Sequence, residues 1–231
     1  MLNLVSLLGG DFLMGSDVHR PDECAVHRVT LRPFRVAPCP VTNADYARFI
    51  DATAAELPKF AADAPFDDPA QPVVGVTWFD AVLYCDWLAR ESGLPLRLPT
   101  EAEREFAARG GRDGDWPWAD APLDILLDAS PALATIARRL APHVPTPACA
   151  NAYGLLCMAE NVHEWCSDWY APDYYARSPA YDPRGPATGR RRASRGGAWR
   201  HQVKFTRITA RSSLDPSFRY NDYGFRLYAD E

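Results

Sequence analysis

The sequence lacks a long hydrophobic run and a basic start. No uninterrupted apolar segment among its 231 residues is long enough to cross a lipid bilayer. The opening residues, MLNLVSLLGGDF, have neither the basic start nor the long apolar region of a secretory signal. We therefore expect a cytoplasmic protein with no membrane association.

Cysteine motifs are also lacking. The six cysteines form no CxxC pair, and their spacing matches neither a zinc ribbon nor a disulfide framework. We expect reduced thiols, most of them buried as small hydrophobic side chains. The net charge of -5 gives no general attraction for nucleic acid or anionic lipid, so partners of both kinds are not expected.

The composition favours a large hydrophobic core in a chain with many loops. Hydrophobic residues make up 47% of the chain and aromatic residues 12%, which is enough to fill a sizeable interior. The 21 prolines and 14 glycines predict many turns and little regular secondary structure. No internal repeat or low-complexity tract divides the sequence, so we expect a single domain over residues 1–231.

Local patterns place the regular elements. Strands are predicted over Leu2–Met14 and Val26–Val36, the second of which alternates apolar with polar residues. Helices are expected over Pro40–Ala52 and after Thr77, the second ending at Gly93. A third helix should begin at Thr100, because Glu103 stands three residues later as in a capping box.

The stretch Asn151–Tyr170, NAYGLLCMAENVHEWCSDWY, combines large aromatic rings with acids, amides, cysteines and a histidine. This mixture fits neither an amphipathic helix nor an alternating strand, so it predicts a semi-buried loop held by its own polar groups. Two interpretations remain open. The loop is either a structural network of hydrogen bonds, or an oxygen-ligated cation site in which Glu164 and Asn161 join backbone carbonyls around an ion such as calcium.

The same stretch resembles the NxxGLxDMxGNVWEWxxDWY signature of the formylglycine-generating enzyme and sulfatase-modifying-factor superfamily. Further motifs of that family occur in order through nearly the whole chain, at Gly10–Ser16, Pro40–Phe49, Pro72–Trp78, Leu96–Glu103, Ala107–Gly111, Arg195–Trp199 and Gly224–Arg226. The resemblance implies an α+β, C-type-lectin-like fold. It also implies an oxidoreductase that converts a sulfatase cysteine to formylglycine with copper held by two cysteines.

Several departures fall around that copper site. His201 and Thr206 stand where the resemblance places the two copper cysteines, and no cysteine follows Cys166. Ala198 replaces the serine of the RGGSW motif, and His163 replaces a tryptophan. We therefore expect a divergent member without sulfatase-cysteine oxidase activity.

Two histidines at these positions suggest a metal site that does not use cysteine ligands. Because His163 and His201 both replace residues that line the active site of relatives, we expect them to approach each other. With Asp168 or Glu160 they could bind iron, copper or zinc. The alternative is a pair of ordinary hydrogen-bonding histidines.

The resemblance also implies a calcium site in the central stretch. Its ligands would be the side chain at Cys157, the carbonyls of Glu160 and Val162, and the side chain of Glu164, although a thiol is a poor calcium ligand. No first calcium site is expected in the segment Asp113–Ala150, where Leu123–Leu140 instead predicts a helix.

Arginine recurs in the terminal block, at Arg195, Arg207, Arg211, Arg219 and Arg226. Its spacing among aromatics suits ion-paired or stacked positions. We also expect Arg195 and Arg211, with Trp199, to line a pocket for a carboxylate-bearing small molecule or peptide. The alternative function is a non-catalytic binding module or an accessory subunit for a protein partner, with its contact residues between Arg200 and Tyr223.

Overall fold

The computed structural model describes residues 2–117, 141–147, 150–202 and 205–231. The three α-helices in this part of the chain are α1 (Asn43–Thr53), α2 (Trp78–Ser92) and α3 (Glu101–Arg109). Each begins with a reciprocal capping box, from Thr42 to Asp45, Thr77 to Asp80 and Thr100 to Glu103. The predicted positions of all three helices are confirmed. The predicted helix over 123–140 lies outside the described residues.

Short strands form three sheets. The first has the order β1 (Val5–Leu7), β4 (Phe34–Val36), β10 (Tyr228–Asp230) and β5 (Leu96–Arg97). The second is the hairpin of β2 (Gly10–Met14) and β3 (His27–Leu31). The third has the order β8 (Arg211–Leu214), β7 (Arg192–Arg195), β6 (His163–Trp169) and β9 (Tyr223–Gly224). Two 3-10 turns, η1 (Pro21–Glu23) and η3 (Tyr174–Arg177), lie in the loops.

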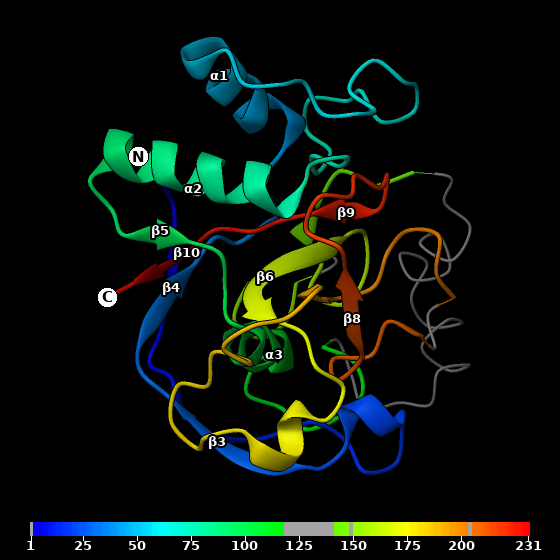
Figure 1. Ribbon diagram of the computed structural model, residues 1–231. Coiled ribbons are helices and arrows are strands. Elements are labelled where there is room, and N and C mark those ends of the chain that lie inside the picture. Colours follow the sequence, from blue (N-terminus) through cyan, green and yellow to red (C-terminus); the bar gives the residue numbers. More distant parts are fainter. Residues whose placement is uncertain (1, 118–140, 148–149, 203–204) are drawn as a thin grey trace.

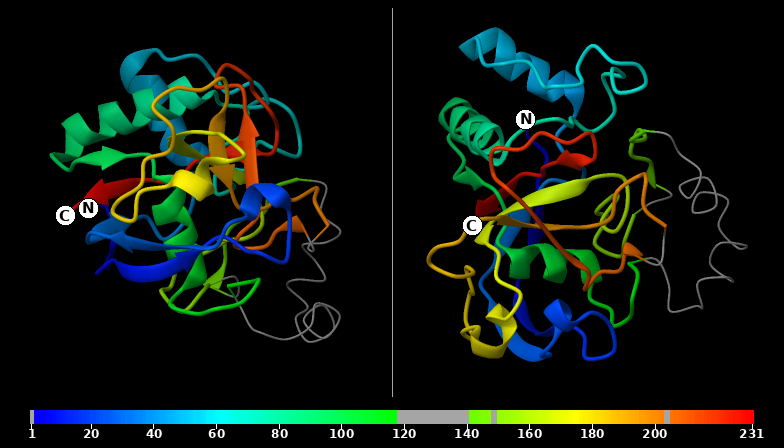
Figure 2. Two further views of the ribbon diagram at one scale, coloured as in Figure 1. Left: turned by 60° about the horizontal axis from the view of Figure 1, so that its bottom comes forward. Right: turned by 45° about the vertical axis from the view of Figure 1, so that its right-hand side comes forward.

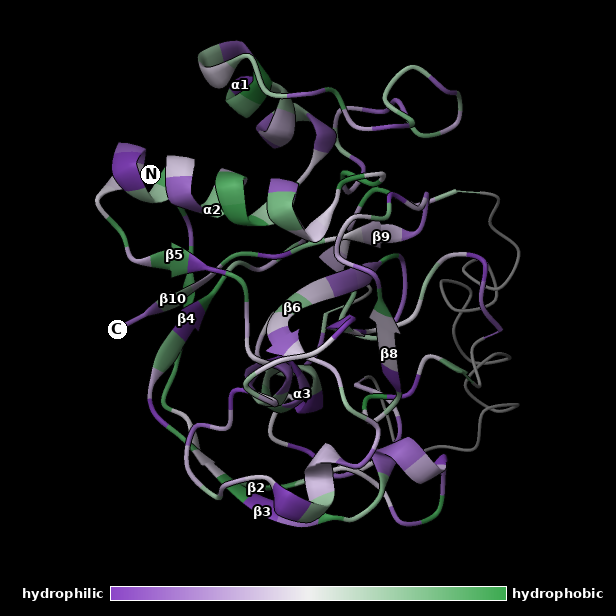
Figure 3. Ribbon diagram, viewed as in Figure 1, coloured by the Kyte–Doolittle hydropathy of each residue, from purple (hydrophilic) through white to green (hydrophobic). Residues whose placement is uncertain are grey.

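The third sheet lies at the centre of the molecule, with α3 below it and α1 and α2 above it in Figure 1. The two further views agree on this arrangement (Figure 2). One cluster of buried side chains joins α1 and α2 to β6, through residues such as Tyr46, Tyr84 and Trp165. Figure 3 shows apolar and polar residues interleaved along α2, as expected of a helix with one buried face.

The prediction of a loop over the whole central stretch is wrong at its end. Residues 163–169 form β6, which pairs antiparallel with β7 and parallel with β9. Five of the seven residues of β6 are buried, polar ones included. A strand covered on both faces shows no alternation of apolar and polar residues, which is why its sequence did not indicate a strand. The two predicted N-terminal strands are each split in two, into β1 with β2 and β3 with β4.

No helix among the described residues is long and apolar enough to cross a membrane. Cys24, Cys39, Cys85 and Cys166 are free thiols.

Candidate functional site

Each of the two predicted histidines is anchored by a backbone hydrogen bond. His163 is the first residue of β6, and its N–H donates to the carbonyl oxygen of Asp222 at 2.8 Å, just before β9. His201 follows the Arg195–Trp199 motif, and its N–H donates to the carbonyl of Ala198 at 2.8 Å. The imidazole centroids of His163 and His201 lie 4.9 Å apart, in a T-shaped arrangement. The predicted approach of these two residues is confirmed.

The carboxylate beside the two histidines is Asp222. The candidate ligand atoms of His163, His201 and Asp222 all lie within 4.8 Å of one another. Oδ2 of Asp222 accepts a hydrogen bond from Nε of Arg200 at 2.6 Å. Its Oδ1 is buried without a hydrogen-bond partner among the described residues, as is Nδ1 of His163. A buried polar atom without a partner is costly, so these two atoms are suited to a ligand.

The carboxylates proposed from the sequence lie elsewhere. Asp168 is near the far end of β6, where its Oδ2 accepts from the N–H of Glu101 at 3.0 Å. Glu160 belongs to a different group, with His143 and Cys157. The third member of the histidine site was therefore missed. The sequence signal that could have identified Asp222 is its position, two residues before the Gly224–Arg226 motif.

The protonation states suit metal binding. Burial, with a further contribution from His201, lowers the pKa of His163 to about 3. Burial also lowers the pKa of His201. The imidazole of His163 is thus neutral at physiological pH, which is the form that binds metals. Burial raises the pKa of Asp222, and the nearby Arg200 guanidinium opposes that shift.

A pocket of ≈ 250 Å³ opens beside the two imidazoles. Its walls combine basic, aromatic and small side chains, namely Arg20, His163, Gly196, His201, Phe205, Arg207, Ala210, Arg211 and Ser212. The volume is below the roughly 300–1,000 Å³ of common ligand pockets, so it suits a small molecule or a single side chain of a peptide.

The five terminal-block arginines are ion-paired, as predicted. The pairs are Arg195–Glu105, Arg207–Glu23, Arg211–Glu101, Arg219 with Glu56 and Asp80, and Arg226–Glu164. This pairing changes the expected role of two of them. Nε and Nη2 of Arg211 donate to the carboxylate of Glu101 at 2.7 and 2.8 Å, and its Nη1 donates to the carbonyl of Asp22 at 2.8 Å. Arg195 is only 1% exposed. Neither offers a free fork to a carboxylate ligand.

The side chain of Trp199 likewise makes other contacts. Its indole Nε1 donates to the carbonyl of Asn221 at 3.0 Å, and its ring lies 6.0 Å from that of Phe66. It is not among the described residues that line the pocket. The exposed cation at the rim is Arg20, whose side chain is 62% exposed.

Glu164 is buried between two arginines. Its Oε2 accepts from Nε of Arg104 at 2.8 Å, and its Oε1 accepts from Nη2 of Arg226 at 2.9 Å. Despite burial, which acts in the opposite direction, these guanidiniums lower the pKa of Glu164. The two arginines supply the positive charge that the calcium interpretation assigned to an ion.

The other predicted calcium ligands lie in one buried turn. The N–H of Val162 donates to the carbonyl of Glu160 at 3.2 Å, and the carbonyl of Asn161 accepts from the N–H of Trp199 at 2.8 Å. These carbonyls therefore take part in hydrogen bonds of the loop. Calcium binding at this turn stays a prediction.

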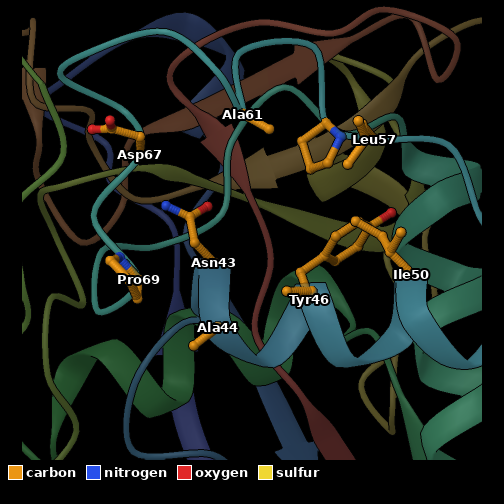
Figure 4. Close-up of a pocket in the computed structure, with 10 residues that line it drawn as sticks. Asn43, Ala44, Tyr46, Ile50, Leu57, Ala61, Asp67 and Pro69 are labelled. Carbon is orange, nitrogen blue, oxygen red and sulfur yellow. The ribbon is translucent and has the colours of Figure 1, made fainter.

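A second pocket, of ≈ 230 Å³, lies between α1 and the loop 57–69. Figure 4 shows Tyr46 and Ile50 on α1, with Leu57 and Ala61 on the loop opposite. Asn43 fixes the loop by donating to the carbonyls of Phe66 and Asp68, each at 2.9 Å. The described residues that line this second pocket include no histidine or cysteine, so the site of chemistry is better sought beside His163 and His201.

Comparison with known proteins supports the resemblance. The model of the sulfatase-modifying factor enzyme 1-like domain matches residues 2–231. A formylglycine-generating enzyme of Streptomyces coelicolor is 34% identical over 98% of this chain and 88% of its own length. The serine/threonine-protein kinase pkn1 of Chlamydia caviae is 35% identical over 96% of this chain, which spans only 37% of that protein.

The fold is shared with a solved structure. PvdO from Pseudomonas aeruginosa superposes with a TM-score of 0.83 at 25% identity, over 99% of this chain and 94% of PvdO. The predicted α+β, C-type-lectin-like fold is confirmed. The chain therefore belongs to the sulfatase-modifying factor enzyme 1-like family, the family that the ordered motifs of its sequence indicated.

Proposed function

We propose that this chain is a divergent member of the family that binds a divalent transition metal, iron in the first place, at His163, His201 and Asp222. It then acts as a metal-dependent oxidoreductase on a small substrate or peptide side chain in the adjoining pocket. The observation that carries this proposal is the mutual approach of the three ligand atoms to within 4.8 Å. Two histidines and one carboxylate are the ligand set of many non-haem iron(II) enzymes that use dioxygen.

The copper chemistry implied by relatives does not suit these residues. Cuprous copper favours soft thiolates, but the chain has no cysteine after Cys166. The thiol of Cys166 is itself fully buried and directed to the carbonyl of Glu164 at 3.8 Å. Thr206, at the position of the second copper cysteine, is 2% exposed. A dithiolate copper oxidase is therefore not proposed.

Each residue of the site has a separate task. His163 presents a neutral imidazole from the rigid end of β6. Asp222 supplies the negative charge, and Arg200 orients its carboxylate through Oδ2. Bound iron(II) would supply a site where dioxygen is reduced. In the simplest balanced reaction the substrate loses two electrons and two protons, and dioxygen accepts them to leave as hydrogen peroxide.

The pocket restricts the substrate by size and charge. Its volume of ≈ 250 Å³ excludes a folded partner but admits one side chain. Arg20 at the rim pairs with Asp22 at 3.2 Å, but its side chain is 62% exposed, so it can also attract a substrate with a negative charge. The exposed ring of Phe205 adds an apolar contact.

Iron binding tests the proposal directly. Metal-free protein loaded with iron(II) under argon and then exposed to nitric oxide should give the electron paramagnetic resonance signal of a high-spin iron–nitrosyl. His201→Ala and Asp222→Asn should each lose that signal, whereas His27→Gln, a histidine outside the cluster, should retain it. Absence of the signal in the wild-type protein, or its persistence in both site variants, would overturn the proposal.

The second candidate is a binding module for a protein or peptide partner. It is favoured by exposed aromatic side chains in the region between Arg200 and Tyr223, with Phe218 50% and Tyr220 40% exposed. A groove formed with Lys59 and Phe60 adjoins these rings. Sister copies in one genome that differ only between Arg200 and Tyr223, together with a wild-type protein that binds no iron, would favour this candidate over the oxidoreductase.

A further inference from the structure

A second cluster of metal-ligating side chains lies outside the histidine pocket. It consists of His143, Cys157 and Glu160, whose candidate ligand atoms all lie within 4.8 Å of one another. His143 comes from the segment 141–147, whereas Cys157 and Glu160 come from the turn that precedes β6. The three side chains are 4%, 0% and 1% exposed, respectively. The cluster is therefore sealed from solvent, unlike the open pocket beside His201.

The spacing of its nitrogen and sulfur atoms suits one tetrahedral ion. Nε2 of His143 lies 3.6 Å from Sγ of Cys157. Zinc binds imidazole nitrogen at about 2.0–2.1 Å and thiolate sulfur at about 2.3 Å, which at a tetrahedral angle puts the two ligands about 3.6 Å apart. The two side chains thus already have the separation that a shared zinc ion requires.

The donor types select the ion. An imidazole nitrogen, a thiolate sulfur and a carboxylate oxygen are the three protein donors that zinc uses most. Calcium takes oxygen ligands almost exclusively, so two of these three donors do not suit it. The donors that the structure brings together therefore do not suit the calcium ion that was predicted in this turn.

The backbone around the cluster is held in an unusual conformation. Cys157 and Asn161 both have positive φ, at 57° and 82°. Non-glycine residues in this region cost free energy and persist where the surroundings over-determine them. Here Asn161 fixes the turn to the neighbouring segment: its Oδ1 accepts from the N–H of His143 at 2.8 Å, and its Nδ2 donates to the carbonyl of His143 at 2.9 Å.

We propose that His143, Cys157 and Glu160 form a buried structural site for a zinc-type divalent cation. The ion ties the segment 141–147 to the turn 157–161. That turn also binds the backbone between Gly196 and His201, two residues that line the histidine pocket, since the carbonyls of Ala159 and Asn161 accept from the N–H groups of Gly197 and Trp199 at 3.1 and 2.8 Å. Zinc here stabilises the wall of the histidine pocket without contacting substrate.

Cobalt(II) provides the test, because a thiolate ligand gives it an intense near-ultraviolet charge-transfer absorption. The full chain, stripped of metal under reducing conditions and titrated with cobalt(II), should show that band, and added zinc should abolish it. Cys157→Ala should lose the band. Cys85→Ala, which removes a buried thiol from α2, should retain it.

Two further variants keep the test decisive. His201→Ala should retain the thiolate band even though it loses iron at the pocket, which separates this proposal from the proposed function. If Cys157→Ala does not fold, His143→Gln, which keeps the thiol, should weaken cobalt binding by more than about tenfold. The proposal is overturned if the wild-type protein shows no thiolate band, or if the band survives in Cys157→Ala. It is also overturned if His143→Gln binds cobalt as tightly as the wild type, or if calcium rather than zinc raises the melting temperature.

Discussion

At the scale of single residues, buried charge is the main feature of this protein. Glu164 is 0% exposed and lies between Arg104 and Arg226, which are 1% and 0% exposed. Removal of one partner from such a group leaves the others charged and desolvated, which is far more costly than loss of a surface pair. The carboxylate therefore holds α3, β6 and the terminal block together.

Glu164→Ala should lower the free energy of unfolding by about 3–5 kcal/mol, because two guanidiniums stay buried without their anion. Glu56→Ala is the matched control: this side chain is 76% exposed beside Arg219, so the cost should be about 0–1 kcal/mol. Urea denaturation measures both. The melting temperature of the metal-free protein should also be measured with and without calcium. If calcium raises the melting temperature of the wild type but not that of Glu164→Ala, Glu164 is a calcium ligand.

Asp168 should make stability depend on pH. Burial, with the nearby Glu101 carboxylate, raises its pKa from 3.8 to about 8. Between these values the folded protein keeps a proton that the unfolded chain releases, so this residue's contribution to the free energy of unfolding falls as pH rises from about 4 to about 8. Asp168→Asn should flatten that slope in urea titrations, whereas Asp51→Asn on α1 should not. A slope unchanged by Asp168→Asn would contradict the assignment.

At the scale of elements, the sequence predicted where the helices begin better than it predicted which segments pack together. The helix starts at Thr42, Thr77 and Thr100 were predictable because a cap is local, involving residues three positions apart. The strand β6 was not, because burial on both faces removes the alternation that marks a strand.

The same distinction applies to the site. His163 and His201 were identified because each departs from a recognised motif. Asp222 and His143 were missed because their roles come from contacts with residues distant in the chain. The terminal arginines show an intermediate case: their composition indicated ion pairs, but only the contacts show that Glu101 and Glu105 occupy the guanidiniums expected to bind a ligand.

The glycine pair after β7 should tolerate little change. A Cβ on Gly197 would lie 2.1 Å from Cγ2 of Thr206 and 2.6 Å from the carbonyl oxygen of Ala159. Gly197→Ala should therefore displace the loop that carries His201, cost roughly 1–3 kcal/mol and abolish iron binding. Gly93→Ala, where a Cβ meets nothing within 4 Å, should cost only the strain of a positive φ and keep iron binding. Equal iron affinity in the two variants would be evidence against this role of Gly197.

At the scale of the whole molecule, family membership and family chemistry separate. The family model matches residues 2–231, yet the positions of the copper cysteines hold His201 and Thr206. A scaffold can keep its packing while the few side chains that define its reaction change.

Formylglycine production should accordingly be absent. A peptide with a Cys-x-Pro-x-Arg sequence, incubated with this protein, copper and a reductant, should keep its mass. A formylglycine-generating enzyme from a relative, run in parallel, should produce the mass loss of aldehyde formation. The same loss with this protein would show that the cysteine-free site retains the family reaction.

The pairing of β6 with β9 has a consequence for how this site can change. His163 is opposite Tyr223 in that parallel register, and its N–H is bound to the carbonyl of Asp222. The distance between positions 163 and 222 is thus set by main-chain bonds that every amino acid except proline can make. Side chains at these two positions can be exchanged without loss of their alignment, so one backbone can present different ligand sets to different metals.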